Sequence, residues 1–531
     1  MMRTVYLKSW KRAETARARA SRRARRSNCR HGAASPLFAV EGKTCMKIHL
    51  MTMRNMTGYS LWFSASKTLK TKRVLQLKYG GQSIRVTLKP QLTSPVQQKG
   101  AVPVGRGTKH TSSVGMEDED EKTVLPSLWI SPRIRESLRL PEEGEFFLRQ
   151  SADEWSLGPC VGFYSNLEST SERPFGEQTN MFIDLSRLGA QKGVDVLILT
   201  PGYLRTRRGW RFDYRTERFV QMAIPHPDII IRRSGTFLPG LLAQVVEDLN
   251  SFKSEGKLHT LPRICGNKWA LYQTLKTDPQ LSGRFPETVL AKNAQEVYRL
   301  IQQKGDVYVK PVSGAQGIQV YHLFIEGGKV VAAWERRLQK LNTKTRLRDN
   351  FQTDVVSKSF ASFAEFSRFW RQTRLHRCLV QDTVVLPRTL KNEPFDFRWL
   401  VQNCGEYTVL ARVARIGQSG AVTTNIHTGA RAMAAETALK AAVWLEPQNV
   451  IRQLDEVALR VAERLEAKYG PFAEVGVDMA VRPDGRVFVF EANPTPGRRM
   501  LRSLNGDVRK LSLVCLLEYA MRATGFELES R

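Results

Sequence analysis

The chain has 531 residues, of which 42% are hydrophobic and 25% are charged, and its formal net charge is +31. This length leaves room for roughly two to four domains with a sizeable hydrophobic core. No apolar run approaches the roughly 18 residues that a membrane-spanning helix needs, so we expect no membrane span.

The basic excess is concentrated at the N-terminus. Residues 1–115 contain 24 Lys and Arg against 2 Asp and Glu, whereas the rest of the chain contains 58 against 49. The net charge therefore says little about the partners of the main body, and nucleic-acid binding is expected only through an N-terminal basic arm.

Residues 1–45 are rich in Arg, Ala and Ser, with RARASRRARR at 17–26, and we expect them to be disordered because they cannot bury a core. Three interpretations remain open. The segment is a nucleic-acid or surface-binding arm, an Arg-rich transit peptide, or an extension upstream of a later start at Met46, Met51, Met53 or Met56.

The seven cysteines are scattered, without a CxxC pair or the spacing of a zinc finger. This usage predicts reduced thiols in an intracellular, cytoplasmic protein.

Residues 46–157 are predicted to form a small β region with an internal repeat. Ser60-Leu61-Trp62 recurs 67 residues later as Ser127-Leu128-Trp129, and strand-like alternation follows, as at Ser83–Leu88. The two copies form a small β domain, or two halves of one. The segment 89–122 between them is rich in Gly, Ser, Lys and Pro and is expected to be a flexible linker.

Two further regions follow. Short apolar strands at 161–164, 195–199 and 228–231, alternating with amphipathic stretches such as 237–254, predict an α/β domain at 158–262 with a parallel sheet. From 263 to 524 we expect helices at 267–276, 361–374, 449–468 and 507–523, and strands at 307–310, 379–385, 396–402 and 407–415.

The most informative stretch is EVGVDMAVRPDGRVFVFEANPTPG, residues 474–497, which predicts a β-hairpin with its turn at 483–486. If Arg482 pairs with Val487, Asp478 faces Glu491, and Asn493 projects from the same face. Two carboxylates about 5 Å apart repel unless a positive charge lies between them. Oxygen ligands of this kind suit Mg²⁺ shared with nucleotide phosphates, although a hairpin with incidental acids at its rim is the alternative.

Two lysines are candidates for holding phosphate. Lys310 ends a strand before a loop that contains Ser313, Gly314 and Gly317, and such glycines let backbone N–H groups approach phosphate oxygens. The loop lacks the GK[ST] ending of a Walker A motif, and a plain tight turn is the alternative. Lys268 begins a helix and would be an ordinary surface residue by default. Whether it binds phosphate depends on the residues around it.

Residues between the apolar strands complete the candidate set. An apolar strand is interrupted or followed by Gln381, Asp382 and Val384. These residues form either a hinge that presents polar groups to an adenine and a ribose, or an ordinary edge strand. Arg398 shares a strand face with Asp396, and Arg412 and Arg415 lie on the next strand. Several arginines near a divalent cation predict anions between them, such as a triphosphate or a substrate carboxylate.

The order of these parts resembles the ATP-grasp superfamily, and specifically the YheC/YheD family of endospore coat-associated proteins. The motifs NKW, VKPVSGAQG, FDFRWLVQN, ARVARIG, TNIHTGA, EVGVDMAV and FEANPTPG carry the resemblance over roughly residues 158–524. It implies an α/β and α+β fold in which two lobes grip ATP, preceded by an α/β pre-grasp domain and a small N-terminal β region.

By matching motif, the resemblance implies that Lys268 and Lys310 hold phosphate, that residues 314–317 cover it, and that residues 381–384 hold adenine. Asp478, Glu491 and Asn493 would bind Mg²⁺. Enzymes of this type phosphorylate a carboxylate and let an amine or a thiol displace the phosphate, with Arg398, Arg412 and Arg415 expected here as anion clamps. The chain departs from the family at Gln319, where a further glycine is usual.

The expected partners are ATP with Mg²⁺ and a small-molecule or peptide carboxylate, together with spore coat proteins. The main alternative is a coat-associated protein that keeps the fold, and ATP binding, without catalysis. The sequence does not identify the acid or the amine, because fold-level similarity does not supply a substrate.

Overall fold

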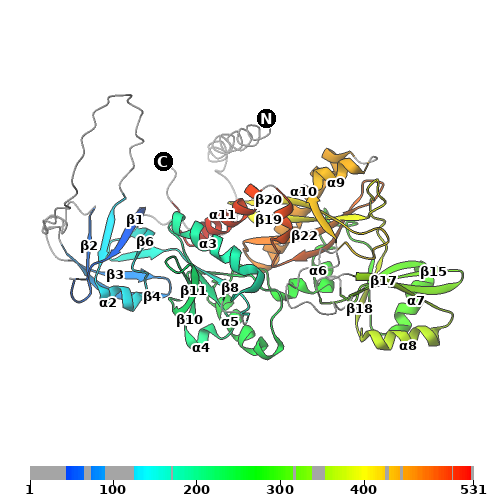
Figure 1. The fold of residues 1–531 in the computed structure, drawn as a ribbon, viewed down its shortest axis with the longest axis horizontal. Coiled ribbons are helices and arrows are strands. Elements are labelled where there is room, and N and C mark those ends of the chain that lie inside the picture. Colours follow the sequence, from blue (N-terminus) through cyan, green and yellow to red (C-terminus); the bar gives the residue numbers. More distant parts are fainter. Residues whose placement is uncertain are drawn as a thin grey trace, which may run out of the picture. The chain divides into compact units, whose positions relative to one another are not determined.

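The computed structural model describes residues 44–54, 56–64, 73–89, 125–168, 172–314, 318–337, 353–424, 430–442, 446–504 and 506–527. All of them belong to one compact unit, Thr44–Arg531, which contains the four sheets that the structure describes (Figure 1). Within these residues, no helix is both long and apolar enough to cross a membrane. The expectations for residues 1–43 and for most of the linker fall outside the described residues.

The first sheet is a closed β-barrel with strand order β1-β5-β2-β4-β3-β7-β6. Its strands β2 and β5 carry the two copies of the repeat and pair antiparallel, with Trp62 opposite Trp129 and their ring centroids 4.2 Å apart. The repeat therefore builds two halves of one barrel. The barrel elements are β1 (Thr44–Thr52), β2 (Ser60–Phe63), β3 (Arg73–Tyr79), β4 (Gln82–Leu88), β5 (Ser127–Ile130), α2 (Pro132–Leu138), β6 (Glu143–Gln150) and β7 (Glu154–Gly158).

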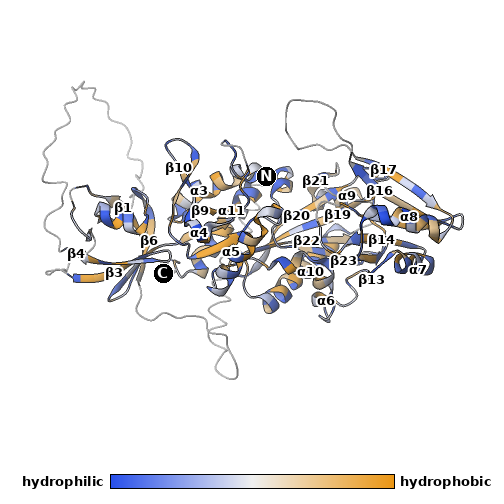
Figure 2. Cartoon of the chain, turned by 90° about the horizontal axis from the view of Figure 1, so that it is seen from below, coloured by the Kyte–Doolittle hydropathy of each residue, from blue (hydrophilic) through white to orange (hydrophobic). Residues whose placement is uncertain are grey.

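The second sheet is mixed, with the order β11-β10-β9-β8-β12. Strands β8, β9 and β12 are parallel, as the apolar runs predict, and β9 is mostly orange in Figure 2 because four of its five residues are apolar. The hairpin of β10 and β11 is antiparallel and was not predicted. The elements are β8 (Cys160–Tyr164), α3 (Thr179–Lys192), β9 (Asp195–Leu199), α4 (Tyr203–Thr206), β10 (Arg208–Asp213), β11 (Arg218–Ala223), β12 (Ile229–Arg232) and α5 (Leu242–Ser254).

The C-terminal helix α11 (Gly506–Ala523) joins the core of this α/β sheet. Its residues Leu513, Leu516 and Leu517 pack in one cluster with Phe182 of α3 and Val196 of β9. The helix is thus a structural part of the α/β region although it lies far away in the sequence.

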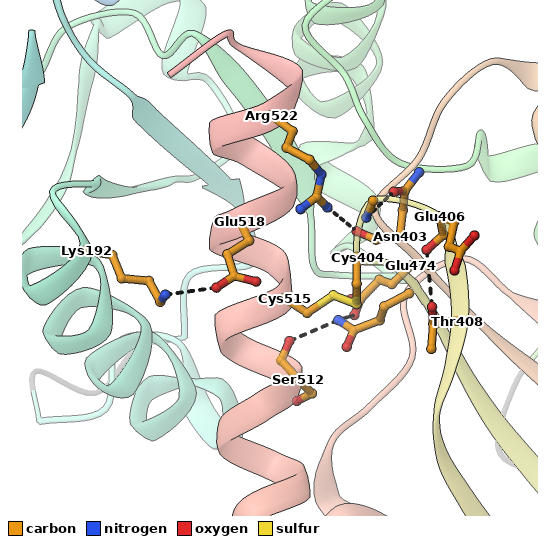
Figure 3. Close-up of a disulfide and its surroundings, with 12 residues drawn as sticks. Lys192, Asn403, Cys404, Glu406, Thr408, Glu474, Ser512, Cys515, Glu518 and Arg522 are labelled. Atoms are coloured by element: carbon orange, nitrogen blue, oxygen red, sulfur yellow. Dashed lines mark hydrogen bonds and ion pairs between the residues drawn. A yellow bond between two sulfur atoms is a disulfide. The ribbon is translucent and has the colours of Figure 1, made fainter. Parts of the chain in front are cut away.

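A disulfide between Cys404 and Cys515 fixes the other side of α11 to the turn after β19 (Phe395–Asn403), as Figure 3 shows. The two Cα atoms lie 5.5 Å apart across a sequence separation of 111 residues. Close by, Arg522 donates to the carbonyl of Asn403. The expectation that the cysteines are reduced is wrong for this pair, because the fold brings together two cysteines that no local spacing connects.

The third sheet is antiparallel, with the order β13-β18-β14-β15-β16-β17, and we call it and its helices the first lobe. Helices α7 and α8 pack their apolar faces on it, through residues such as Ile301 and Phe366. The elements are β13 (Thr288–Ala291), α7 (Ala294–Lys304), β14 (Asp306–Pro311), β15 (Tyr321–Glu326), β16 (Lys329–Arg337), β17 (Thr353–Phe360), α8 (Phe363–Thr373) and β18 (Cys378–Asp382).

The fourth sheet, with the order β21-β20-β19-β22-β23, forms the second lobe. Its largest buried side chain, Trp399, packs with apolar residues of α10 such as Leu454 and Val461. The elements are α6 (Lys268–Leu275), β19, β20 (Tyr407–Ile416), β21 (Arg431–Ala434), α9 (Ala435–Ala441), α10 (Pro447–Tyr469), β22 (Glu474–Val481) and β23 (Val487–Asn493). The helices and strands predicted for residues 263–524 are all present, with ends that differ by a few residues.

Candidate functional site

A cavity of about 160 Å³ lies between the two lobes. Its apolar lining comes from both, including Tyr308 and Val320 of the first lobe and Val422 and Phe490 of the second. Its charged lining comprises Lys268, Lys310, Asp382, Asp396, Arg415, Asp478 and Glu491. A cleft with apolar walls and a few converging charged groups is the usual form of a small-molecule site.

The hairpin places Asp478 opposite Glu491, as predicted, but by a different route. Near the turn, Val481 pairs with Val487, so the expected partnership of Arg482 with Val487 is wrong. A bulge between Asp478 and Met479 then shifts the register by one residue and restores the expected pair. The extra residue, Phe490, lies in the cavity wall, since bulges re-aim side chains.

Asp478 is the centre of a ladder of buried ion pairs. Arg398 donates to both of its oxygens, at 2.6 Å from Nη2 to Oδ2, and Arg415 donates from Nη1 to Oδ2 at 2.9 Å. Arg415 also forms a bidentate pair with Asp396, at 2.7 and 2.5 Å. Period-two alternation along β19 places Asp396 and Arg398 on one face, and β20 supplies Arg415 directly across from Asp396.

Glu491 connects this ladder to the lysines. Lys268 Nζ lies 3.0 Å from its Oε2, and Arg398 Nη2 lies 3.9 Å from its Oε1. Burial opposes ionisation of this carboxylate, but Lys268 and Arg398 together lower the pKa of Glu491 to about 2. Glu491 is therefore an anion at every physiological pH.

At Lys310, in contrast to Glu491, burial outweighs the attraction of the neighbouring opposite charge. Burial disfavours its charged form, and the neighbouring Lys268 adds repulsion, so the pKa of Lys310 falls to about 8 although Glu491 works against the shift. Its Nζ lies 5.7 Å from the centroid of the Phe490 ring. A buried lysine with a lowered pKa is stabilised by an anion that enters the cavity.

We call Lys268, Lys310, Asp396, Arg398, Arg415, Asp478 and Glu491 the charged cluster. It combines four basic with three acidic side chains, and Asp382, a further acidic residue of the cavity lining, brings the two signs into balance when Lys310 is protonated. The four basic side chains gathered at this cavity are groups that bind phosphate and carboxylate anions.

The structure separates Arg412 from this cluster. Arg412 lies three residues before Arg415 on β20, so the two side chains leave opposite faces of the strand. Arg412 donates to Asp455 of α10 at 2.8 and 2.6 Å, and the indole of Trp399 donates to the same carboxylate at 2.7 Å. These contacts tie the sheet to α10, away from the cavity.

The hinge residues Gln381, Asp382 and Val384 line the cavity, as the sequence predicts. The amide of Gln381 is buried and donates to the hydroxyl of Thr288 at 2.9 Å. Asp382 lies 2.9 Å from Lys304. The polar side chain of Gln381 is thus already engaged within the first lobe.

The glycine loop begins next to Lys268. The backbone N–H of Lys268 donates to the carbonyl of Val312 at 2.9 Å, and its Nζ donates to the carbonyl of Gly314 at 2.8 Å. Gly314 has φ +149° and Ser313 is exposed. Gly317 lies outside the described residues.

Gln319 has φ +59°, in the left-handed region that favours glycine. Its amide donates to the carbonyl of Thr373 at the end of α8, at 2.8 Å. In this chain a side-chain hydrogen bond accompanies a backbone conformation that glycine would adopt with less strain.

The predicted Mg²⁺ ligands share the right chemistry, because all three offer hard oxygen atoms. Asp478 already accepts three guanidinium N–H bonds, and Oδ1 of Asn493 accepts the N–H of Thr495 at 3.0 Å. Among the described residues, no group of three or more His, Cys, Asp or Glu side chains is placed to hold a metal. The side chain of Glu491 is 29% exposed, whereas that of Asp478 is 4% exposed.

The sequence did not single out Asp396, Tyr308 or Phe490 as site residues. The alternation that links Asp396 to Arg398 was visible, but its pairing with Arg415 depends on strand register. Phe490 enters the cavity through a bulge, which the residue pattern does not reveal.

A family model described as YheC/D-like ATP-grasp matches residues 258–522 of the chain. Two proteins of Bacillus subtilis (strain 168) are similar in sequence. Endospore coat-associated protein YheD is 25% identical over 427 residues, which cover 78% of this chain and 88% of that protein. Endospore coat-associated protein YheC is 21% identical over 275 residues, or 50% of this chain and 69% of that protein.

Among solved structures, that of the ATP-grasp ligase PsnB in complex with a minimal precursor has a TM-score of 0.40 and 13% sequence identity, and the match covers 68% of this chain and 98% of that one. The two-lobed architecture, the order of the motifs and the matched family model agree with one another. The chain belongs to the YheC/D-like ATP-grasp family, and the cavity between the lobes lies entirely within its matched residues.

Proposed function

We propose that the protein is an ATP- and Mg²⁺-dependent ligase that activates a carboxylate as an acylphosphate for attack by an amine or a thiol. The observation that carries the proposal is the charged cluster at the cavity between the lobes, which gathers four basic groups, among them a lysine whose pKa is lowered to about 8. Phosphoryl transfer depends mainly on positioning and on neutralising the charge of the transferred group, and this arrangement supplies both.

In this proposal the apolar walls and residues 381–384 hold the adenine, and Lys268 and Lys310 hold phosphate oxygens next to the loop that starts at Ser313. Asp478, Glu491 and Asn493 would hold Mg²⁺, which supplies charge neutralisation on the phosphates. For this, Asp478 must exchange part of its guanidinium contacts for the ion.

A carboxylate oxygen of the substrate attacks the terminal phosphorus of ATP, and the bond from that phosphorus to the ADP oxygen breaks. The amine nitrogen then attacks the acyl carbon, inorganic phosphate leaves with the electrons of the acyl C–O bond, and the amine loses a proton to water. Arg398 and Arg415 stabilise the negative charge that develops in both steps. Arg412 has no role here because it faces α10.

We also propose the domain limits 46–157 for the barrel region, 158–262 for the α/β domain and 263–524 for the ATP-grasp domain, after an N-terminal extension of residues 1–45. The carboxylate belongs to a small molecule or a peptide. Association with the spore coat is supported by the names of the two relatives, and the disulfide removes the argument from cysteines for a cytoplasmic, reducing compartment.

A second candidate function is nucleotide binding without catalysis, in a coat-associated protein. One observation favours it: the oxygens of Asp478 are occupied by Arg398 and Arg415 instead of being open to a metal ion.

Release of ADP from ATP in the presence of pools of carboxylic acids and amines distinguishes the two. With a carboxylate labelled with ¹⁸O, the ligase transfers one labelled oxygen to the released phosphate, because the acyl C–O bond breaks in the second step. Nucleotide binding with no ADP release in any pool, and no transfer of label, would support the non-catalytic alternative.

A further inference from the structure

A hydrogen-bonded contact made by Glu335 connects the first lobe to the segment after β20 in the cavity wall of the second lobe. Glu335, on β16 of the first lobe, accepts the backbone N–H of Thr423 on Oε1 at 2.7 Å. The hydroxyl of Thr423 lies 3.1 Å from Oε1 and 3.0 Å from Oε2 of the same carboxylate. A backbone and a side-chain group of one residue are thus directed at one carboxylate.

The contact lies at the cavity. Val422, Thr423 and Thr424 are consecutive lining residues from the segment after β20, and Thr424 is 5% exposed. On the other side, the charge of Glu335 contributes, after burial and Asp306, to raising the pKa of Tyr308, another lining residue, to about 12. Glu335 therefore acts electrostatically on a lining residue of the first lobe and is hydrogen-bonded to a lining residue of the second.

Hydrogen bonds to a carboxylate are stronger than those between neutral groups, and both partners here are only partly exposed to water. The chain itself connects the two lobes through residues 383–394. The lobes are also in contact where Lys268 donates to the carbonyls of Val312 and Gly314. The contact at Thr423 adds a separate restraint, on the segment after β20, which limits how far a two-lobed cavity opens.

We infer that Glu335 is a positioning residue that holds residues 422–424 in the cavity wall and so retains the nucleotide between the lobes. The inference rests on the proposed function only in the identity of the ligand. It assigns to Glu335 no contact with the reacting atoms and no proton transfer.

The test uses the full chain with Mg²⁺ and N-methylanthraniloyl-ATP, and measures the dissociation rate by stopped-flow fluorescence after addition of excess ATP. We expect Glu335→Ala to accelerate release about tenfold or more, which corresponds to about 1.4 kcal/mol. Thr423→Val should also accelerate release, and Thr423→Ser, which restores a hydroxyl, should release the nucleotide within about twofold of the wild-type rate.

The matched control is Glu326→Ala, which removes an exposed carboxylate at the far end of the neighbouring strand β15. It should leave the release rate unchanged. Thermal unfolding of each variant separates a general loss of stability from an effect on the nucleotide.

Hydrogen exchange of the amide of Thr423 in the absence of nucleotide tests the contact independently of the ligand, and Glu335→Ala should accelerate it. Absence of nucleotide binding by the wild-type protein would refute the proposed function and leave this measurement valid. Binding by the wild type with unchanged release from Glu335→Ala, or unchanged exchange at Thr423, would overturn the inference.

Discussion

The lowered pKa of Lys310 leads to a quantitative prediction for nucleotide binding. In the free protein its pKa is about 8, because the ammonium is buried and lies near Lys268. A polyphosphate supplies the missing negative charge, so we expect the bound form to keep Lys310 protonated well above pH 8, towards the ordinary lysine pKa of about 10.4.

The sign and the size of the pH dependence of ATP affinity follow from proton linkage. Well below pH 8 the lysine is almost fully charged, so binding takes up almost no proton there. Between pH 8 and 10 the free protein has lost the proton that the complex holds, so affinity falls as pH rises. The protonated fraction is about 0.9 at pH 7 and about 0.1 at pH 9 for this pKa, which predicts a tenfold loss of affinity, or about 1.4 kcal/mol.

Titration calorimetry at pH 8 in two buffers with different ionisation enthalpies measures the protons taken up. The prediction is about half a proton per ATP bound, since half of the free protein is protonated at its pKa. The terminal phosphate of the nucleotide does not interfere, because a phosphate of this type ionises near pH 6.

Two variants distinguish the contribution of Lys310 to the pH dependence of binding from that of other titratable groups. Lys310→Met should remove both the proton uptake and the dependence on pH. Lys304→Met is the matched control, because despite partial desolvation Asp382 and Glu287 raise the pKa of Lys304, and it stays charged throughout. Affinity of the wild type that does not change between pH 7 and 9 would refute the reasoning.

Three further predictions concern the surroundings of the site. Gln319→Gly should relieve a left-handed backbone strain of about 1 kcal/mol and lose one hydrogen bond of similar size, so the free energy of unfolding should change by less than about 1 kcal/mol in urea titrations; destabilisation by several kcal/mol would contradict this balance. Reduction, or Cys404→Ser with Cys515→Ser, should lower the free energy of unfolding by about 2–4 kcal/mol, and differential alkylation should label both thiols only after reduction; labelling without reduction would exclude the disulfide. Arg412→Gln, which leaves Asp455 with less of its ion pairing, should lower stability by about 1–3 kcal/mol and leave nucleotide affinity unchanged, and a large loss of affinity would return Arg412 to the site.

Residue patterns predicted the elements of the two lobes because their strands and helices carry clear apolar periodicity. The facing pair Asp478 and Glu491 was found by assuming a plain hairpin, and the structure reaches the same pair through a bulge at Phe490. The agreement there is partly fortunate, since a one-residue shift without the bulge moves every side chain to the other face.

Contacts that depend on pairing between distant segments could not be predicted. Nothing local to Cys404 indicates Cys515, which lies 111 residues away on a helix of another core. Likewise, Glu335 reads as an ordinary polar residue on a strand until the fold brings Thr423 to it. Arg412 and Arg415 are the same residue type on the same strand, but their side chains leave opposite faces of it. Arg412 therefore contacts α10, whereas Arg415 contacts Asp478 in the site.

The measurement that tests the central claim most directly is ATP binding by calorimetry, with and without Mg²⁺, on the full chain and on a variant that combines Asp478→Asn with Glu491→Gln. We predict Mg²⁺-dependent binding by the wild type that this folded variant loses. Absence of binding by the folded wild-type protein, or equal Mg²⁺-dependent binding by the variant, would contradict a metal–nucleotide site at the hairpin.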